Sequence, residues 1–465
     1  MTPNGISESD IFASVIIIAA FVMAAGIIGR WLTNRFGQPA VLGELLIGIF
    51  AGNIGYWAGA PVFLVIMHLT EVAEIFSKVW LSGLSIVEAT KQVLREGGLG
   101  LGEVGTQLGA ILIGPNGPIL VVTGITLWLF SSLGVLFLLF LVGLESSPRE
   151  VRQLGPRPIL VATIGVMAPL GLGYMAIWWL LPESPHAVHL FVAATLSATS
   201  VGITARVLRD LGKQKTPEAL LILGAAVIDD ILGLIILALV VGIVTTGEFR
   251  IAELLRISLL SMVFFGVLFI AGDRIVHWGI RLFRALDHHT YKLIFPVVLM
   301  LTTAWLANVI GLAAIVGAFA AGLVLTEEKF ARYPDPGPTL QDIISPLQTV
   351  FAPLFFVLMG MQVNLASFLE PRVAWLSLVL TVAAVLGKLA AGLPASGRAS
   401  PLSVGIGMVP RGEVGLIFAG TGKALGVVDD ALFSAIILMV VATTLVAPPG
   451  LKWSFSRAEA AARVA

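Results

Sequence analysis

The chain has 465 residues, of which 57% are hydrophobic and only 12% are charged, and its mean hydropathy is +0.99. Such an apolar composition excludes a soluble globular protein of this size and indicates a helical protein that crosses a membrane many times. The net charge is zero, which gives no reason to expect a nucleic-acid partner, and the lack of cysteine excludes disulfides and thiolate metal sites.

Apolar runs bounded by charged residues or proline predict thirteen membrane-spanning helices, since a crossing needs about 20 apolar residues. The eighth and ninth runs form one stretch that is too long for a single crossing, so we divide it between Asn308 and Gly311. The predicted spans are 11–29, 40–56, 121–144, 159–181, 188–204, 220–244, 254–271, 293–308, 312–325, 350–363, 373–393, 404–424 and 432–447.

Positive residues indicate the orientation of these spans. Most of the 28 lysines and arginines follow the odd-numbered spans, and such residues collect on the cytoplasmic side. The first ten residues contain Glu8 and Asp10 but no lysine or arginine, which is not a signal-peptide start. We therefore expect a multi-pass membrane protein with its N-terminus outside and its C-terminus in the cytoplasm.

A long outer connection, 60–118, separates the second and third spans. Val72, Ile75, Phe76 and Val79 recur in it at helical spacing, with charged residues between them. This pattern predicts amphipathic helices at the membrane surface. A lid or packing element without chemistry is the simplest role for them.

Two adjacent carboxylates, Asp229 and Asp230, lie near the middle of the sixth span. A carboxylate at that depth costs roughly 2.5–3.5 kcal/mol on insertion scales, so ionisable residues there indicate function. The two side chains are about 100° apart around a helix and cannot face one partner. One can pair with a cation on a neighbouring helix while the other faces a water-filled cavity.

Lys388, in the eleventh span, has two interpretations. Its side chain can extend to the inner headgroups, or it can form an ion pair with a carboxylate such as Asp229. Glu44 lies near the inner end of the second span, and we expect it to have a packing or interfacial role rather than a role in transport.

Two spans contain helix-breaking sequences. Residues 194–203 hold four hydroxyl side chains, among them Thr199 and Ser200, and residues 405–415 hold glycines, a proline, Arg411 and Glu413. Broken helices at corresponding places in two halves indicate the binding site of a transporter, where freed carbonyls coordinate a cation. Arg411 and Glu413 either pair with each other or act on the ion directly.

Several short stretches carry a resemblance to a known family, and their order and spacing are specific. The chain resembles the bacterial sodium/proton antiporters of the monovalent cation:proton antiporter-2 family. The stretches are Gly43-Glu44-Leu45-Leu46-Ile47-Gly48, Phe140-Leu141-Val142-Gly143-Leu144-Glu145, Ala198-Thr199-Ser200-Val201-Gly202, Asp229-Asp230, Gly317-Ala318-Phe319-Ala320-Ala321-Gly322, Gly360-Met361, Gly387-Lys388 and Arg411-Gly412-Glu413.

The resemblance implies an all-α fold of about thirteen transmembrane helices, with inverted repeats and two crossed, broken helices, and a homodimer in a bacterial inner membrane. Residues 158–245 and 373–450 would form an ion-binding core, and 451–465 a cytoplasmic tail. Residues 1–145, with the insert 60–118, and 292–365 would form a panel for dimerisation. Residues 251–272 would be a linker helix.

The resemblance also implies roles for single residues. Asp230 binds the ion, a sodium at this position, while Asp229 pairs with Lys388. Thr199 and Ser200 belong to the broken helix near the ion, and Arg411 and Glu413 form a charged pair that supports the site. The core moves against the panel to carry the ion.

The expected activity is exchange of Na⁺ or Li⁺ for H⁺, with no resident cofactor and no catalysis. Two acidic groups can carry two protons per cation, so we expect net charge movement. A potassium/proton exchanger of the same fold and a sensor that binds without flux are alternatives. An intramembrane aspartyl protease needs two aspartates that face each other from different helices, which neighbours on one helix cannot do.

Overall fold

The computed structural model describes residues 8–36, 38–96, 103–145, 155–246, 251–288, 290–312, 314–325, 329–330, 338–366, 370–395 and 399–464. Every regular element in these ranges is a helix. The chain folds into two compact units, which we describe separately. The first unit contains Met1–Gly134, Val350–Leu378 and Leu416–Val441, and the second contains Val135–Thr349, Val379–Gly415 and Ala442–Ala465.

Each of the thirteen predicted spans falls on one helix or on two helices separated by a short break. In chain order, the helices are α1 (Glu8–Arg35), α2 (Ala40–Trp57), α3 (Pro61–Met67), α4 (Leu69–Ser82), α5 (Ile86–Glu96), α6 (Glu103–Ile113), α7 (Gly117–Glu145), α9 (Arg157–Leu180), α10 (His186–Ser197), α11 (Val201–Asp210), α12 (Pro217–Thr246), α13 (Ile251–Leu286), α14 (Tyr291–Val309), α15 (Ala314–Val324), α17 (Leu340–Met361), α18 (Pro371–Ala390), the 3₁₀ turn η2 (Leu393–Ala395), α19 (Pro401–Gly407), α20 (Gly412–Ala424) and α21 (Asp430–Val464).

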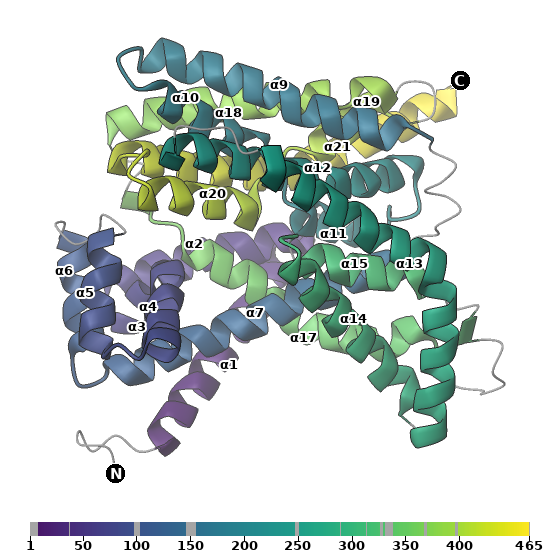
Figure 1. The fold of residues 1–465 in the computed structure, drawn as a ribbon, viewed down its shortest axis with the longest axis horizontal. Coiled ribbons are helices and arrows are strands. Elements are labelled where there is room, and N and C mark those ends of the chain that lie inside the picture. The colour runs from purple at the N-terminus through teal and green to yellow at the C-terminus, as the bar shows by residue number, and fades with distance from the viewer. Residues whose placement is uncertain are drawn as a thin grey trace. The chain divides into compact units, whose positions relative to one another are not determined.

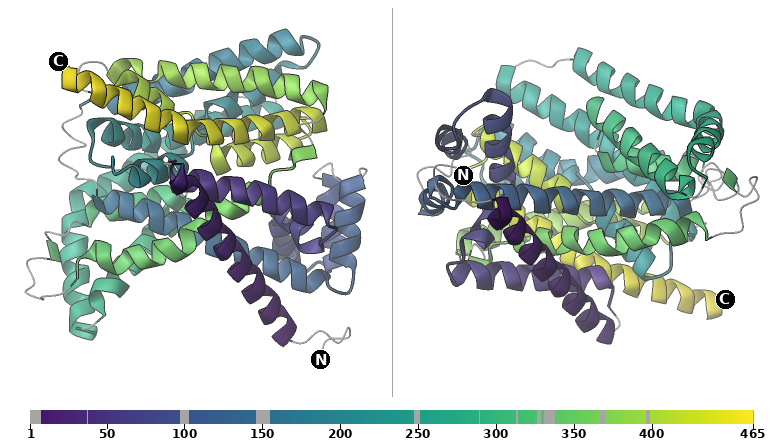
Figure 2. Two further views of the ribbon diagram at one scale, coloured as in Figure 1. Left: turned by 180° about the vertical axis from the view of Figure 1, so that it is seen from behind. Right: turned by 90° about the horizontal axis from the view of Figure 1, so that it is seen from below.

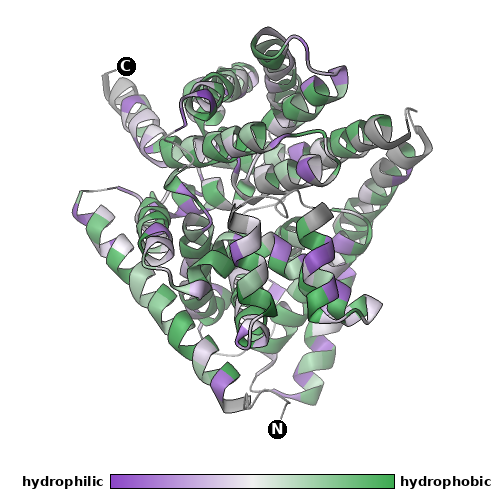
Figure 3. Cartoon of the chain, turned by 90° about the vertical axis from the view of Figure 1, so that its left-hand side faces the viewer, coloured by the Kyte–Doolittle hydropathy of each residue, from purple (hydrophilic) through white to green (hydrophobic). Residues whose placement is uncertain are grey.

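The described helices include ten that are long and apolar enough to cross a membrane, or eleven with the bent pair Leu259–Leu268 and Ile270–Leu286. Hydrophobic residues occupy most positions along these helices (Figure 3). The shorter helices α15, α19 and α20 do not qualify alone, so the count of thirteen stays a prediction. The division of the long apolar stretch is confirmed, because α14 ends at Val309 and α15 begins at Ala314. Gly311 between them has a φ of 93°, which glycine adopts readily.

In the first unit, the insert forms four helices, α3 to α6, beside the start of α7 (Figures 1 and 2). Val72 and Ile75 are fully buried, whereas Phe76 and Val79 pack at the edge of the same apolar cluster. The predicted helical spacing is therefore confirmed. At the start of α5, the Ser85 hydroxyl and amide donate to Glu88, which lowers the pKa of that carboxyl, and the Glu88 amide donates back.

Close helix crossings in the same unit explain several of the motif glycines. A Cβ on Gly43 of α2 would lie 2.0 Å from the Gly29 oxygen of α1. A Cβ on Gly360 of α17 would lie 2.3 Å from the Leu45 oxygen of α2. Side chains at these positions would force the helices apart, so the glycines set how closely the backbones approach.

In the second unit, α12 packs against α9, α10, α11 and α19, and these helices gather in one group (Figure 1). Its apolar core contains Val161, Ala162, Leu221, Ile222, Ala225, Ala391, Ala395, Val404 and Met408. Gly143 of α7 and Gly322 of α15 face each other at a second close crossing, where a Cβ on Gly322 would lie 2.0 Å from the Phe140 oxygen. The predicted tail is the last part of α21, which continues as helix to Val464.

Candidate cation site

The adjacent aspartates and the lysine of the sequence analysis lie in the second unit. Lys388 Nζ lies 2.9 Å from Asp229 Oδ1, and the two side chains are 0% and 1% exposed. The ammonium group is therefore at a carboxylate and does not extend to a headgroup. Removing one partner of such a pair leaves the other charged, buried and unpaired, which is strongly unfavourable.

Close packing of α9 against α18 gives Lys388 its place. A Cβ on Gly387 would lie 2.6 Å from the α-carbon of Pro169, so α18 passes next to the α9 backbone. A Cβ on Gly165 would lie 3.5 Å from Lys388 Nζ. Gly165, Pro169 and Gly387 all lie within apolar helices, where such residues are unfavourable. Their presence there was the sequence feature from which the close packing of α9 against α18 could have been predicted.

Asp230 differs from its neighbour in direction and exposure. Successive residues of a helix are about 100° apart, so the two carboxylates face different ways. Asp230 is 8% exposed, against 1% for Asp229. With Asp229 held by Lys388, Asp230 is the second carboxylate of the site and lies on the helix that packs against α10 and α11.

The first predicted helix break lies between α10, which ends at Ser197, and α11, which begins at Val201. Ala198 and Ser200 have extended backbones, with ψ of 149° and 107°. In the described part of the chain, no donor is bonded to the carbonyl oxygens from Thr195 to Thr199. A helix C-terminus carries partial negative charge, so this break presents oxygens suited to a cation.

The second predicted break lies between α19, which ends at Gly407, and α20, which begins at Gly412. Every carbonyl oxygen from Val404 to Pro410 accepts a hydrogen bond. Backbone amides serve four of these carbonyls: Met408 N donates to Val404 and Gly405, Val409 N donates to Ile406, and Ser200 N donates to Pro410 at 2.8 Å. The Gly407 carbonyl accepts from Thr204 Oγ1 at 2.6 Å. The Met408 carbonyl accepts from Thr199 Oγ1 at 3.4 Å and Arg411 Nη1 at 3.3 Å, and the Val409 carbonyl accepts from Arg411 Nη1 at 2.8 Å.

The two breaks touch each other at Ser200. Its amide donates to Pro410, as described, and a Cβ on Gly412 would lie 2.4 Å from the Ser200 hydroxyl oxygen. Thr199 and Ser200, predicted to lie near the ion, are both fully buried there. A hydroxyl that donates its hydrogen to a carbonyl still has lone pairs for a cation.

Arg411 is fully buried and closes the end of α19. Its Nη2 also donates to the Ala384 oxygen of α18, at 3.3 Å, one helical turn before Lys388. The backbone of Glu413 lies in the first turn of α20, but its side chain is outside the described residues. Pairing of Arg411 with Glu413 therefore stays a prediction. The hydrogen bonds from Arg411 and Thr204 to backbone carbonyls were not predicted from the sequence.

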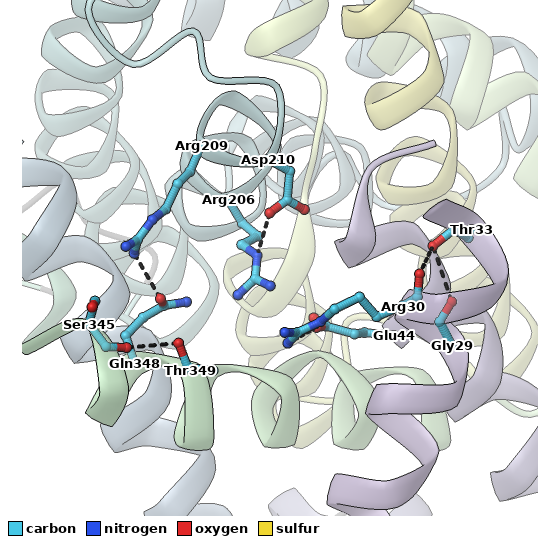
Figure 4. A network of polar contacts seen from close by, with 10 residues as sticks. All are labelled: Gly29, Arg30, Thr33, Glu44, Arg206, Arg209, Asp210, Ser345, Gln348 and Thr349. Carbon is cyan, nitrogen blue, oxygen red and sulfur yellow. Dashed lines mark hydrogen bonds and ion pairs between the residues drawn. The ribbon is translucent and has the colours of Figure 1, made fainter. Parts of the chain in front are cut away.

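Other polar pairs lie in each unit (Figure 4). In the second unit, Arg206 binds Asp210 at 3.0 Å and Arg209 binds Gln348 at 2.8 Å. In the first unit, Glu44 is fully buried and its Oε1 lies 2.9 Å from Arg30 Nη2. A packing or interfacial role was expected for Glu44, but its ion pair with Arg30 was not predicted. No group of three His, Asp or Glu side chains in the described ranges forms a candidate metal site.

The fold has a counterpart among solved structures. It matches the solved structure of the sodium proton antiporter MjNhaP1 from Methanocaldococcus jannaschii over 96% of this chain and 97% of that one, with a TM-score of 0.56 and 15% identity. The chain therefore has the fold of a membrane antiporter, as the sequence predicted, with ten or eleven candidate spans among the described residues.

Sequence comparison then gives the family. The family model described as "Sodium/hydrogen exchanger, transmembrane" matches residues 99–457. The high-affinity Na(+)/H(+) antiporter NhaS3 of Synechocystis is 36% identical over 71% of this chain and 71% of its own length, and the Na(+)/H(+)-K(+) antiporter GerN of Bacillus cereus is 34% identical over 70% and 82%. The chain belongs to the sodium/hydrogen exchanger family. It is a multi-pass cation:proton antiporter and not an enzyme, as predicted.

Proposed function

We propose that the protein exchanges Na⁺ or Li⁺ for H⁺ by alternating access. The observation that carries the proposal is the Asp229–Lys388 ion pair, 2.9 Å long and excluded from solvent. Because that pair neutralises Asp229, we assign cation binding to Asp230. It lies on α12, which packs against α10 and α11, the two helices on either side of the first break.

Competition for one carboxylate couples the two fluxes. Asp230 holds either a proton or a cation, and both at once would leave a net positive charge in a site of low polarity. The hydroxyls of Thr199 and Ser200 and the carbonyls of the first break supply further oxygen ligands, which hard alkali cations accept. Arg411 and Glu413 support the site without contacting the ion.

Movement of the loaded site requires two parts of the chain. We assign residues 158–245 and 373–450 to the moving core, 251–272 to the linker helix, and 1–145 and 292–365 to a panel through which two copies form a homodimer. The insert 60–118 belongs to the panel, and 451–465 is a tail. Positive residues support an N-terminus outside and a C-terminus inside the inner membrane.

The exchange is electrogenic in this scheme. Asp230 exchanges its proton for the cation, and Asp229 takes a second proton when its pair with Lys388 opens, so the two carboxylates provide two proton-binding groups for each cation. A cycle with two protons per sodium moves one net charge, so a membrane potential changes its rate. A rate that is indifferent to voltage would contradict this part of the proposal.

A second candidate is exchange of K⁺ for H⁺. The relative from Bacillus cereus is named a Na(+)/H(+)-K(+) antiporter, and a relative from Bacillus subtilis, 26% identical, is named a K(+)/H(+) antiporter subunit. The paired Asp229 favours sodium, since related potassium-efflux proteins resembling this chain have a neutral residue there. Selectivity is decided by presenting Na⁺, Li⁺ and K⁺ separately.

The test uses the purified chain in proteoliposomes with an imposed pH gradient and an internal pH dye. Addition of Na⁺ or Li⁺ should collapse the gradient, and Asp230→Asn should abolish that response. Asp10→Asn, an exposed aspartate near the start of α1, is the matched control and should behave as wild type. Wild-type exchange rates in Asp230→Asn would rule out the assignment.

A further inference from the structure

Thr204 makes an unusual hydrogen bond for a threonine in a helix. Hydroxyls of helical serine and threonine commonly bond back to a carbonyl three or four residues earlier. Thr303 of α14 does this, with its Oγ1 2.8 Å from the Leu299 oxygen. Thr204 is the fourth residue of α11, and the residues that precede α11 are extended, so its hydroxyl instead reaches the Gly407 oxygen of α19, at 2.6 Å.

The acceptor of this bond is the last carbonyl of α19. The backbone amides of Met408 and Val409 serve the carbonyls before it, from Val404 to Ile406. Thr204 is the donor that remains for Gly407, and its side chain is 1% exposed. A buried carbonyl that loses its donor is unfavourable, so without this hydroxyl the end of α19 would shift to find another partner.

Such a shift would reach the ion pair through Arg411. The carbonyls of Met408 and Val409, directly after Gly407, both accept from the Arg411 guanidinium. The same guanidinium donates to Ala384 of α18, one turn from Lys388. Lys388 in turn holds Asp229, the neighbour of Asp230.

We propose that Thr204 is a positioning residue of the transport cycle, which holds the end of α19 against α11 so that the cation site keeps its geometry. The proposal rests on the proposed function, because the site it positions is the one built on Asp230. Thr204 acts through Gly407, Arg411 and Lys388, and the proposal assigns it no contact with the ion.

The experiment compares Thr204→Val with Thr303→Val in the proteoliposome assay. Both changes remove one buried threonine hydroxyl, but Thr303 bonds back within α14, whereas Thr204 joins α11 to α19. Thr204→Val should raise the apparent KM for sodium about tenfold, which corresponds to about 1.4 kcal/mol of binding free energy, because the site loses the geometry that the Thr204 bond maintains. Thr303→Val should keep the wild-type KM, although its thermal stability falls.

Rescue by the conservative variant separates positioning from general damage. Thr204→Ser retains the donor and should restore the KM. Thr204→Cys, in a chain that has no other cysteine, supplies a weaker donor of similar volume and should give an intermediate KM even if Thr204→Val does not fold. A wild-type KM in the cysteine variant would overturn the inference.

The two proposals fail in different ways. If the wild type exchanges cations and Asp230→Asn does not, but Thr204→Val and Thr303→Val share the wild-type KM, the inference is wrong and the proposed function stands. If the wild type exchanges none of Na⁺, Li⁺ and K⁺, the proposed function is wrong and the inference falls with it.

Discussion

The two helix breaks of the second unit have the same secondary structure and opposite hydrogen bonding. In each, a helix ends, a few residues without helical structure follow, and a second helix begins. After α10, the carbonyls from Thr195 to Thr199 accept no hydrogen bond from the described residues. Around the end of α19, every carbonyl from Val404 to Pro410 is occupied.

These opposite patterns explain how a chain can break two helices at one place and use only one break for ligands. Unpaired carbonyls in a membrane interior are costly, and the end of a helix concentrates negative charge. Arg411 removes this cost at the second break by supplying a positive charge and several donors at once. We infer that the second break is support and that the first break keeps its oxygens for a cation.

The largest expected effect follows from removing the guanidinium that closes the second break. Arg411→Met leaves the Val409 carbonyl without a donor and the Met408 carbonyl with only a 3.4 Å bond from Thr199. Two poorly paired buried carbonyls predict a loss of about 2–5 kcal/mol in the free energy of unfolding. Thermal and denaturant unfolding in detergent micelles measure the loss.

Arg411→Lys is the matched control, because it keeps the charge. A single ammonium group cannot serve carbonyls of α19 and of α18 together, so lysine should recover part of the stability but not all of it. Equal stability of Arg411→Met and wild type would show that the carbonyl contacts do not stabilise the break. The contrast between the two breaks would then lose its energetic meaning.

The next effect concerns the point where the breaks touch. Gly412 has a φ of 42°, and a Cβ there would lie 2.4 Å from the Ser200 hydroxyl oxygen. Gly412→Ala should therefore cost about 1–3 kcal/mol of unfolding free energy. Gly426→Ala controls for backbone strain alone, since Gly426 also has a positive φ, of 68°, but nothing lies within 4 Å of its Cβ position.

The control variant should cost only about 1 kcal/mol. If the two glycines give the same loss, Ser200 yields to the new methyl group without cost, and the contact between the breaks is loose. A larger loss at Gly412 supports a tight contact. Sodium transport should fall with Gly412→Ala and stay unchanged with Gly426→Ala.

Much of the site could be predicted because its residues contradict the local pattern. Carboxylates and a lysine inside apolar runs are costly, so Asp229, Asp230 and Lys388 were identifiable from the sequence, and so was the pairing that the structure contains. The break between α10 and α11 could be predicted from its hydroxyl residues. Helix positions followed from apolar runs, although short helices such as α15 left the number of spans undetermined.

The remaining contacts could not be predicted, because they join positions far apart in the sequence through the backbone. The hydroxyl of Thr204 bonds a carbonyl 203 residues away, and a carbonyl has no sequence signature. The acceptors of Arg411 are carbonyls as well, so attention to charged partners led to Glu413 instead. Arg30, the partner of Glu44, lies on the neighbouring helix and was not considered.

The smallest expected effect on stability is at the first break, between α10 and α11. It tests most directly whether this break, unlike the second, provides oxygens for the cation. Thr199→Ala removes a 3.4 Å bond to a carbonyl that Arg411 also serves, so it should cost less than about 1 kcal/mol of unfolding free energy. Its apparent KM for sodium should rise at least about tenfold, because an oxygen ligand is lost. Thr199→Ser retains that oxygen and should bind as wild type. A variant that loses as much stability as Arg411→Met, with an unchanged KM, would mean that both breaks are support and that the cation takes its oxygens elsewhere.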